Sequence, residues 1–277
     1  ARRLRLPRAG VLLEDPPRAV RAARFLARLP GFRLDPLMRP ELAAAARKLD
    51  AVAPERRLAE LDEVLAAEPA PAARALRQLE TWGGLAALLP GIAVSERRRG
   101  LAALGSARRD APPALFRALL LSGAPPDRAA AALDALRTSR SDRRLAATLA
   151  GLPAPSPRPD ATEAIRLLRR AAPFSREAIA FVEATGGRAG RALARLADAA
   201  LAAPGALGRL LNPRRPFPVS EVAAILGAAG PELGRALERL DDALATGAVH
   251  GARQARAFLS GRLRYAPARS RRKRLPV

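Results

Sequence analysis

Hydrophobic positions recur every three to four residues in short segments separated by Pro and Gly, a pattern typical of amphipathic helices. The charged, turn-rich stretch 95–113 is expected to hold a domain boundary near residue 100, and the proline-rich stretches 153–159 and 211–218 are expected to be loops. Helices are predicted over residues 16–28, 36–49, 54–67, 72–89 with an interruption near 83–84, 114–122, 126–137, 140–150, 161–171, 175–185, 187–202, 219–227, 231–246 and 251–263.

The composition supports an all-α fold class without a sheet domain. Ala and Leu dominate the apolar residues, aromatic residues make up only 3% of the chain, and Ala, Leu, Arg and Glu are strong helix formers. Residue types that favour strands are scarce. The short helices could form a series of bundles or an α-solenoid. A regular solenoid is the weaker alternative, because no fixed repeat period holds across more than two segments.

The formal net charge of +23 indicates a polyanionic partner, since each neutralised phosphate releases counterions. Lys48 and Lys273 are the only lysines, so codon bias toward Arg is the alternative origin of the charge. The stretch 262–277 contains no acidic residue. It is either a solvated tail or a segment that contacts RNA phosphates. The candidate RNA-binding residues there are Arg262, Arg264, Arg271, Arg272 and Lys273.

Several classes of site are excluded by residue counts. With no Cys, the chain cannot form disulfides or thiolate metal sites, which fits a cytoplasmic location. The single His250 cannot form a His-rich metal site, and we expect it to be a surface or packing residue. No stretch of about 18 uncharged apolar residues occurs, so no membrane partner is expected.

The segment 13–28, LEDPPRAVRAARFLAR, contains the most informative chemistry. Asp15 and Arg18 lie three residues apart at a helix start, which places them at neighbouring positions. A carboxylate only accepts hydrogen bonds and a guanidinium only donates them. Together they match the base edges of cytosine and adenine, which place an amino donor beside a ring acceptor, and reject guanine and uracil. The alternative is a capping Asp beside a solvated, Arg-rich helix face.

Motifs in register over residues 12–90 resemble the bacterial tRNA nucleotidyltransferase/poly(A) polymerase family, which includes CCA-adding and A-adding enzymes. Residues 14–25 resemble its EDPxRxxRAxRF motif, and residues 31–36 resemble its GFxLxP turn. Residues 52–61 resemble its VSxERxxxEL segment, and residues 73–90 a neck helix ending in Leu-Leu-Pro. A looser resemblance covers Pro173–Ala178, which is similar to the body of A-adding enzymes, and residues 217–234, which are similar to the LGxxPGPxxG tail pattern.

The resemblance implies roles for individual residues. Asp15 and Arg18 would read the nucleotide base, and Glu14 would orient that pair. Arg21 and Arg24 would lie near nucleotide phosphates or pack the neck helix. Within the segment 52–61, Glu55 and Arg56 would brace the neck helices through an ion pair.

In this family the chemistry belongs to an N-terminal head with a Gly-rich phosphate loop and a DxD pair that binds two Mg²⁺ ions. This chain has no DxD, and only 13 residues precede Glu14. We therefore expect no catalytic residue and no metal site in it, with Mg²⁺ and ATP or CTP used by the full-length enzyme. The run 105–110, GSARRD, mimics a phosphate loop but is expected to join two helices.

The expected organisation follows from the resemblance. Residues 1–13 would be a remnant of the head–neck junction, 14–100 the neck, 101–210 the body, 211–263 the tail and 264–277 a disordered basic segment. The chain would be the tRNA-binding, nucleotide-selecting part of a template-independent nucleotidyltransferase that adds C and/or A to tRNA 3′ ends. Its partners would be tRNA, incoming ATP or CTP and the missing head, and alone it would be inactive. The alternative is a non-catalytic RNA-binding helical scaffold.

Overall fold

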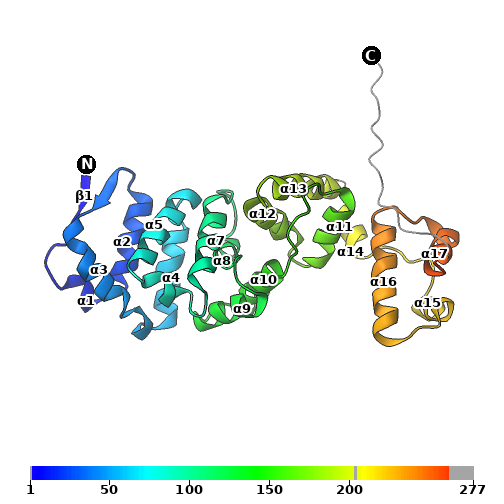
Figure 1. Ribbon diagram of the computed structural model, residues 1–277, viewed down its shortest axis with the longest axis horizontal. Coiled ribbons are helices and arrows are strands. Elements are labelled where there is room, and N and C mark those ends of the chain that lie inside the picture. The colour runs from blue at the N-terminus through cyan, green and yellow to red at the C-terminus, as the bar shows by residue number, and fades with distance from the viewer. Residues whose placement is uncertain (1, 203–204, 262–277) are drawn as a thin grey trace, which may run out of the picture. The chain divides into compact units, whose positions relative to one another are not determined.

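The computed structural model describes residues 2–202 and 205–261. Within them the chain forms seventeen α-helices, two short 3-10 helices and one pair of three-residue strands (Figure 1). The predicted all-α fold class is therefore confirmed. The chain divides into two compact units, unit 1 with residues 1–154 and 180–191, and unit 2 with residues 155–179 and 192–277.

Unit 1 contains all the elements from β1 to α10. Most predicted helices appear within a few residues of their expected bounds, and the predicted interruption is confirmed, because Gly83 adopts a positive φ of 83° between two helices. The elements are β1 (Arg2–Leu4), α1 (Val11–Glu14), α2 (Arg18–Arg28), β2 (Phe32–Leu34), η1 (Pro36–Met38), α3 (Arg39–Ala46), η2 (Leu49–Ala51), α4 (Pro54–Leu65), α5 (Pro69–Thr81), α6 (Gly84–Leu88), α7 (Val94–Gly105), α8 (Pro113–Leu120), α9 (Pro126–Ala135) and α10 (Arg140–Ala150).

The core of unit 1 is built from Leu and Ala. Helix α5 packs against α2 and α7, α7 packs against α8, and α10 packs against α8 and α9. Small Ala side chains on α2 and α5 let these helices approach closely, and Leu side chains fill the space between them. The largest fully buried side chains are all leucines of this unit: Leu42, Leu49, Leu61, Leu65, Leu76, Leu79, Leu85, Leu88, Leu89, Leu101, Leu104 and Leu115.

Helix α7 corrects the expectation that residues 95–113 are turn-rich. The backbone N–H of Ala93 donates to Glu96 Oε2 at 2.8 Å, so Glu96 satisfies an amide at the helix start. Gly100, a poor helix former, lies inside α7, where a Cβ atom would stand 1.9 Å from the carbonyl oxygen of Leu120. The glycine thus permits close contact with α8. The run 105–110 begins at the last residue of α7 and continues into the connection to α8, which confirms the expected helix-to-helix connection.

Strands β1 and β2 pair in parallel, with Arg2 beside Phe32, Arg3 beside Arg33 and Leu4 beside Leu34. The sequence did not predict this pairing. It fastens the chain before α1 to the chain after α2, and Asp35 extends it because its N–H donates to the Leu4 carbonyl at 3.0 Å.

Unit 2 has a small apolar core of its own. Its buried members are Phe217, Val222, Leu240, Ala243, Val249, Ala255 and Leu259. The helices are α11 (Ala161–Arg170), α14 (Ala206–Leu211), α15 (Val219–Leu226), α16 (Gly230–Ala245) and α17 (Gly251–Leu259), while α12 (Ser175–Thr185) and α13 (Gly187–Leu201) belong partly to each unit.

Ion pairs connect three segments of unit 2. The buried Asp241 of α16 accepts two hydrogen bonds of 2.7 Å from Arg215 and lies 3.4 Å from Arg169 of α11. Arg169 also lies 3.1 Å from Asp242. His250 is exposed and precedes α17, as expected for a surface residue.

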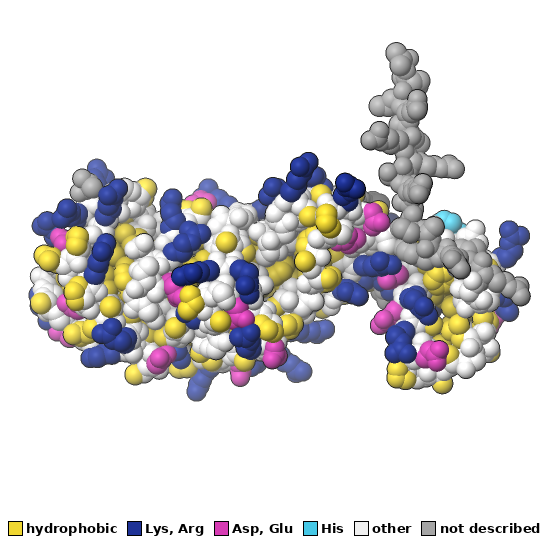
Figure 2. All heavy atoms as spheres, viewed as in Figure 1, with side chains coloured by type: hydrophobic (Ala, Val, Ile, Leu, Met, Phe, Trp, Pro, Cys, Tyr) yellow, Lys and Arg dark blue, Asp and Glu magenta, His cyan; other side chains and the backbone are white. Residues whose placement is uncertain are grey.

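The two compact units do not coincide with the neck, body and tail expected at 14–100, 101–210 and 211–263. The proline-rich stretch 153–159 is free of helix, as predicted, and the stretch 212–218 is too. The segment 264–277, predicted to be disordered, lies outside the described residues. No helix in the described part of the chain is long and apolar enough to cross a membrane. Arg and Lys side chains are spread widely over the face shown in Figure 2.

Candidate nucleotide-selecting site

The site predicted from sequence lies at the start of α2. Gly10, with φ of 83°, begins the short helix α1, and Asp15 separates α1 from α2. Pro16 and Pro17 lack amide hydrogens, so they leave no unsatisfied donors at the helix start. The Ala and Val side chains of α2 face the core, which leaves four arginines at spacings of three or four residues on its outer side: Arg18, Arg21, Arg24 and Arg28.

Asp15 and Arg18 lie together, as their spacing predicted. Arg18 Nε is 3.6 Å from Asp15 Oδ2, and Arg18 Nη1 donates to the Val11 carbonyl at 2.9 Å. Asp15 Oδ1 accepts a hydrogen bond of 2.8 Å from Arg56 Nη2, and Arg21 Nη1 lies 3.7 Å from Oδ2. Within the described chain, Oδ2 of Asp15 and Nε of Arg18 make no hydrogen bond, and Oδ2 lies within ion-pair distance of both Arg18 and Arg21.

Glu14 is engaged mainly with another residue. Its two carboxylate oxygens accept hydrogen bonds of 2.6 and 2.7 Å from Arg8, and only a 3.9 Å contact reaches Arg18. The hydrogen bond from Arg8 lowers the pKa of Glu14. Its expected orienting effect on the Asp15–Arg18 pair would therefore act through this weak contact.

Arg21, Arg24 and Arg28 face carboxylates of α4. Arg21 Nε donates to Glu60 Oε1 at 2.5 Å, an interaction that raises the pKa of Arg21. Arg24 and Arg28 lie 3.4 and 2.9 Å from Glu63 Oε2. Two roles were expected for Arg21 and Arg24, and these direct contacts agree with the packing of helices rather than with phosphate binding. A phosphate would have to compete with the carboxylates.

A pocket of about 590 Å³ opens beside these arginines. Arg18, Arg21 and Arg24 line it, whereas Asp15 and Glu14 do not. Its other walls are mainly apolar and include the half-exposed ring of Phe25, together with Leu4, Val11, Leu34 and Met38. Apolar walls with a few charged groups are typical of pockets that hold small molecules. The structure thus places three of the five predicted residues around one cavity.

Glu55 and Arg56, expected to brace the helices through an ion pair, each pair with a different element. Arg56 joins α4 to Asp15 at the start of α2, and Glu55 accepts a hydrogen bond of 2.9 Å from Arg137, which follows α9. Both contacts connect helices, although Glu55 and Arg56 have separate partners.

Two buried charged residues of α4 were given no role from the sequence, although Glu60 belongs to the segment 52–61 that resembles the family motif. Arg57 and Glu60 are each only 9% exposed, and Arg57 Nη1 donates to the Ala87 carbonyl at 2.6 Å. The sequence did contain a signal for their burial, because Arg57 and Glu60 share a face of α4 with the apolar Leu61 and Val64. Charged residues at core positions of an amphipathic helix indicate buried partners.

The remaining predicted residues lie outside the described chain: Arg262, Arg264, Arg271, Arg272 and Lys273. Among the residues that the structure describes, no group of three or more His, Cys, Asp or Glu side chains is arranged to hold a metal ion. Comparison of the sequence with models of known protein families and with curated proteins finds no match.

Proposed function

We propose that this chain is the tRNA-binding and nucleotide-selecting part of a template-independent nucleotidyltransferase that adds C and/or A to tRNA 3′ ends. Catalysis, with Mg²⁺ and ATP or CTP, belongs in this proposal to a head domain of the full-length enzyme. A cytoplasmic location is part of the same proposal, since tRNA is processed there.

One observation supports the proposal most directly: the 3.6 Å contact between Asp15 and Arg18, of which Arg18 lines a pocket with apolar walls. Asp15 Oδ2 can accept from an exocyclic amino group, and Arg18 Nε can donate to a ring nitrogen. Cytosine and adenine present that pair of groups. The side chains remain partly exposed, at 21% for Asp15 and 38% for Arg18, so an incoming base could reach them.

The second candidate is a non-catalytic RNA-binding helical scaffold. The ion pairs of Asp15 with Arg56 and of Arg21 with Glu60 favour it, because they join α2 to α4 without any ligand. In a scaffold, the same side chains would contribute only to stability, and the chain would not discriminate between bases.

Nucleotide binding separates the two candidates. Saturation-transfer NMR on this chain should detect binding of ATP and CTP. GTP and UTP should bind several-fold more weakly. Asp15→Asn replaces an acceptor with an amide that can also donate, so it should remove that preference. Asp110→Asn, the same change at an exposed carboxylate of the α7–α8 connection, is the matched control and should leave it intact.

Equal binding of all four nucleotides to the unaltered chain would exclude base selection by Asp15 and Arg18. The coding sequence upstream of Ala1 gives a second test. A frame that supplies a Gly-rich loop and a DxD pair supports the enzyme, whereas a promoter and stop codon there favour the scaffold.

A further inference from the structure

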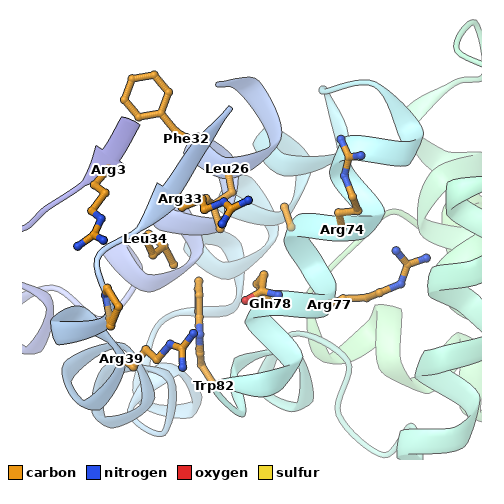
Figure 3. Close-up of a pocket in the computed structure, with 12 residues that line it drawn as sticks. Arg3, Leu26, Phe32, Arg33, Leu34, Arg39, Arg74, Arg77, Gln78 and Trp82 are labelled. Carbon is orange, nitrogen blue, oxygen red and sulfur yellow. The ribbon is translucent and has the colours of Figure 1, made fainter. Parts of the chain in front are cut away.

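A second pocket of unit 1, about 610 Å³ in volume, is lined by five arginines (Figure 3). Arg3 and Arg33 come from the two paired strands, and Arg39 comes from the start of α3. Arg74 and Arg77 lie one turn apart on the outer face of α5. Gln78 and the edge of the largely buried Trp82 complete the wall next to α5. We call this cavity the arginine pocket.

The arginine pocket contains no acidic residue. None of its five arginines has a carboxylate within 4.0 Å in the described chain, and Arg77 makes only a 3.4 Å hydrogen bond to the Leu101 carbonyl. Outside the lining, Asp35 comes under the influence of Arg3, a minor cause of its lowered pKa, but its carboxylate is hydrogen-bonded to Arg5 and to the Leu37 amide.

Several other arginines of unit 1 are paired with acids where elements meet. Arg97 pairs with Glu80 at 2.9 Å, Arg117 with Asp62 at 2.7 Å, and Arg128 with Glu96 at 2.5 Å. Overall composition supplies many arginines, but it does not account for five gathered around one cavity that no acidic side chain lines. Their mutual repulsion would be relieved by a bound anion.

The strand register strengthens this repulsion. Arg3 and Arg33 are register partners across the parallel β1–β2 pair, so two like charges project from adjacent backbone positions and disfavour the pairing. A pair of strands only three residues long has few hydrogen bonds to offset that effect. A ligand with several negative charges would stabilise it.

We propose that the arginine pocket binds consecutive backbone phosphates of an RNA strand. Guanidinium groups suit phosphate oxygens because they donate two parallel hydrogen bonds. The charges are distributed over both walls of an open cavity, which fits a strand that passes through with more than one phosphate in contact. The inference rests on the RNA partner in the proposed function and concerns side chains other than the Asp15–Arg18 pair.

The test is fluorescence anisotropy with a labelled single-stranded RNA of about 12 nucleotides. The triple variant Arg33→Gln, Arg74→Gln and Arg77→Gln should weaken binding about tenfold or more and flatten the dependence of log Kd on log salt by about two units. The single variant Arg33→Gln should weaken binding about threefold. The side chain of Arg33 is exposed and makes no hydrogen bond in the described chain, so this variant keeps the test valid if the triple variant fails to fold.

The matched control removes three charges elsewhere in unit 1, through Arg98→Gln, Arg140→Gln and Arg144→Gln, at exposed positions outside the arginine pocket. It should change the affinity less than about threefold. Equal losses in both sets would mean that only net charge matters and would overturn the assignment. Inorganic triphosphate serves as a second probe. If the pocket variants still bind RNA but no longer bind inorganic triphosphate, the assignment to RNA is overturned in favour of free polyphosphate.

Failure of this inference can be separated from failure of the proposed function. If the unaltered chain binds neither this RNA nor tRNA, the RNA-binding part of the proposed function and this inference both fail. If RNA binds but the pocket variants behave like the control, only the inference fails. The preference for ATP and CTP should persist in the pocket variants, because base selection is assigned to Asp15 and Arg18.

Discussion

Arg21 of α2 donates a hydrogen bond of 2.5 Å to Oε1 of Glu60 on α4, while Oε2 of the same carboxylate has no hydrogen-bond partner in the described chain. Glu60 is 9% exposed, whereas the Arg21 side chain is 37% exposed. The carboxylate is therefore committed to the interior, and the guanidinium reaches it from the surface. This pair fixes α2, which carries the candidate site, on α4.

Replacement of Glu60 should destabilise unit 1. Glu60→Ala removes a buried acceptor and leaves the Nε of Arg21 without its partner, so we expect a loss of about 1–3 kcal/mol in the free energy of unfolding. Chemical denaturation followed by circular dichroism measures it. Glu63→Ala, one turn further along α4 at a half-exposed carboxylate, is the control, with an expected loss below about 1 kcal/mol. Equal effects would argue against a special contribution from the buried pair.

In unit 2, Asp241 should be the carboxylate most sensitive to replacement. Asp241→Ala leaves Arg215 and Arg169 without a shared acceptor, and we expect a loss of about 1–3 kcal/mol, below the range for fully buried pairs because Arg215 is one-third exposed. Thermal or urea unfolding provides the measurement. Asp198→Ala, at an exposed position of α13, should stay within about 0.5 kcal/mol, and a comparable loss there would contradict the prediction.

Gly100→Ala should strongly destabilise the contact between α7 and α8. The new Cβ would meet the Leu120 carbonyl oxygen at 1.9 Å and its carbon at 2.5 Å, so one helix backbone would have to move. We expect a loss of about 2–4 kcal/mol. Gly234→Ala in α16, where nothing lies within 4 Å of the new atom, should instead be neutral or stabilise by up to about 1 kcal/mol. Stabilisation by Gly100→Ala would disprove the close packing.

Acidification should weaken unit 1 partly through Asp35. The hydrogen bond from the Leu37 amide, and then Arg5, hold the pKa of Asp35 below its ordinary value of 3.8. A carboxyl group whose pKa is lower in the folded state stabilises the fold above its unfolded pKa, and that contribution disappears as the pH falls through the folded pKa. The free energy of unfolding should therefore decrease as the pH falls below about 5.

The control for this pH dependence is the Asp35→Asn variant, which should show a flatter decline over the same range. Asp110→Asn, at an exposed loop position, should retain the steep decline. Parallel curves for Asp35→Asn and the unaltered protein would remove Asp35 as a contributor.

Helix positions could be predicted largely from the sequence, because apolar periodicity and Pro/Gly punctuation are local signals. The predicted ranges 140–150 and 175–185 agree with α10 and α12. Helix α7 escaped prediction because Gly100 and a run of charges indicate a loop locally. The reason for that glycine lies 20 residues further along the chain, at the backbone of Leu120.

The candidate site could be predicted only as far as local spacing at a helix start allows. The proximity of Asp15 and Arg18 follows from their separation of three residues, and the structure confirms it. Their competitors could not be foreseen, because Arg56 reaches Asp15 across 41 residues of sequence and Glu60 reaches Arg21 across 39. Such contacts depend on how α2 packs on α4. The arginine pocket likewise depends on strand pairing that no local pattern indicated.

The pairing of β1 with β2 has a thermodynamic consequence. If an anion in the arginine pocket offsets the like charges of Arg3 and Arg33, then closing the strand pair and occupying the pocket favour one another. The amides of these strands should exchange with deuterium faster than those of α5 in the free protein, and more slowly once a polyanion is added. The degree of order of the N-terminal strand would then depend on whether the cavity beside it holds an anion.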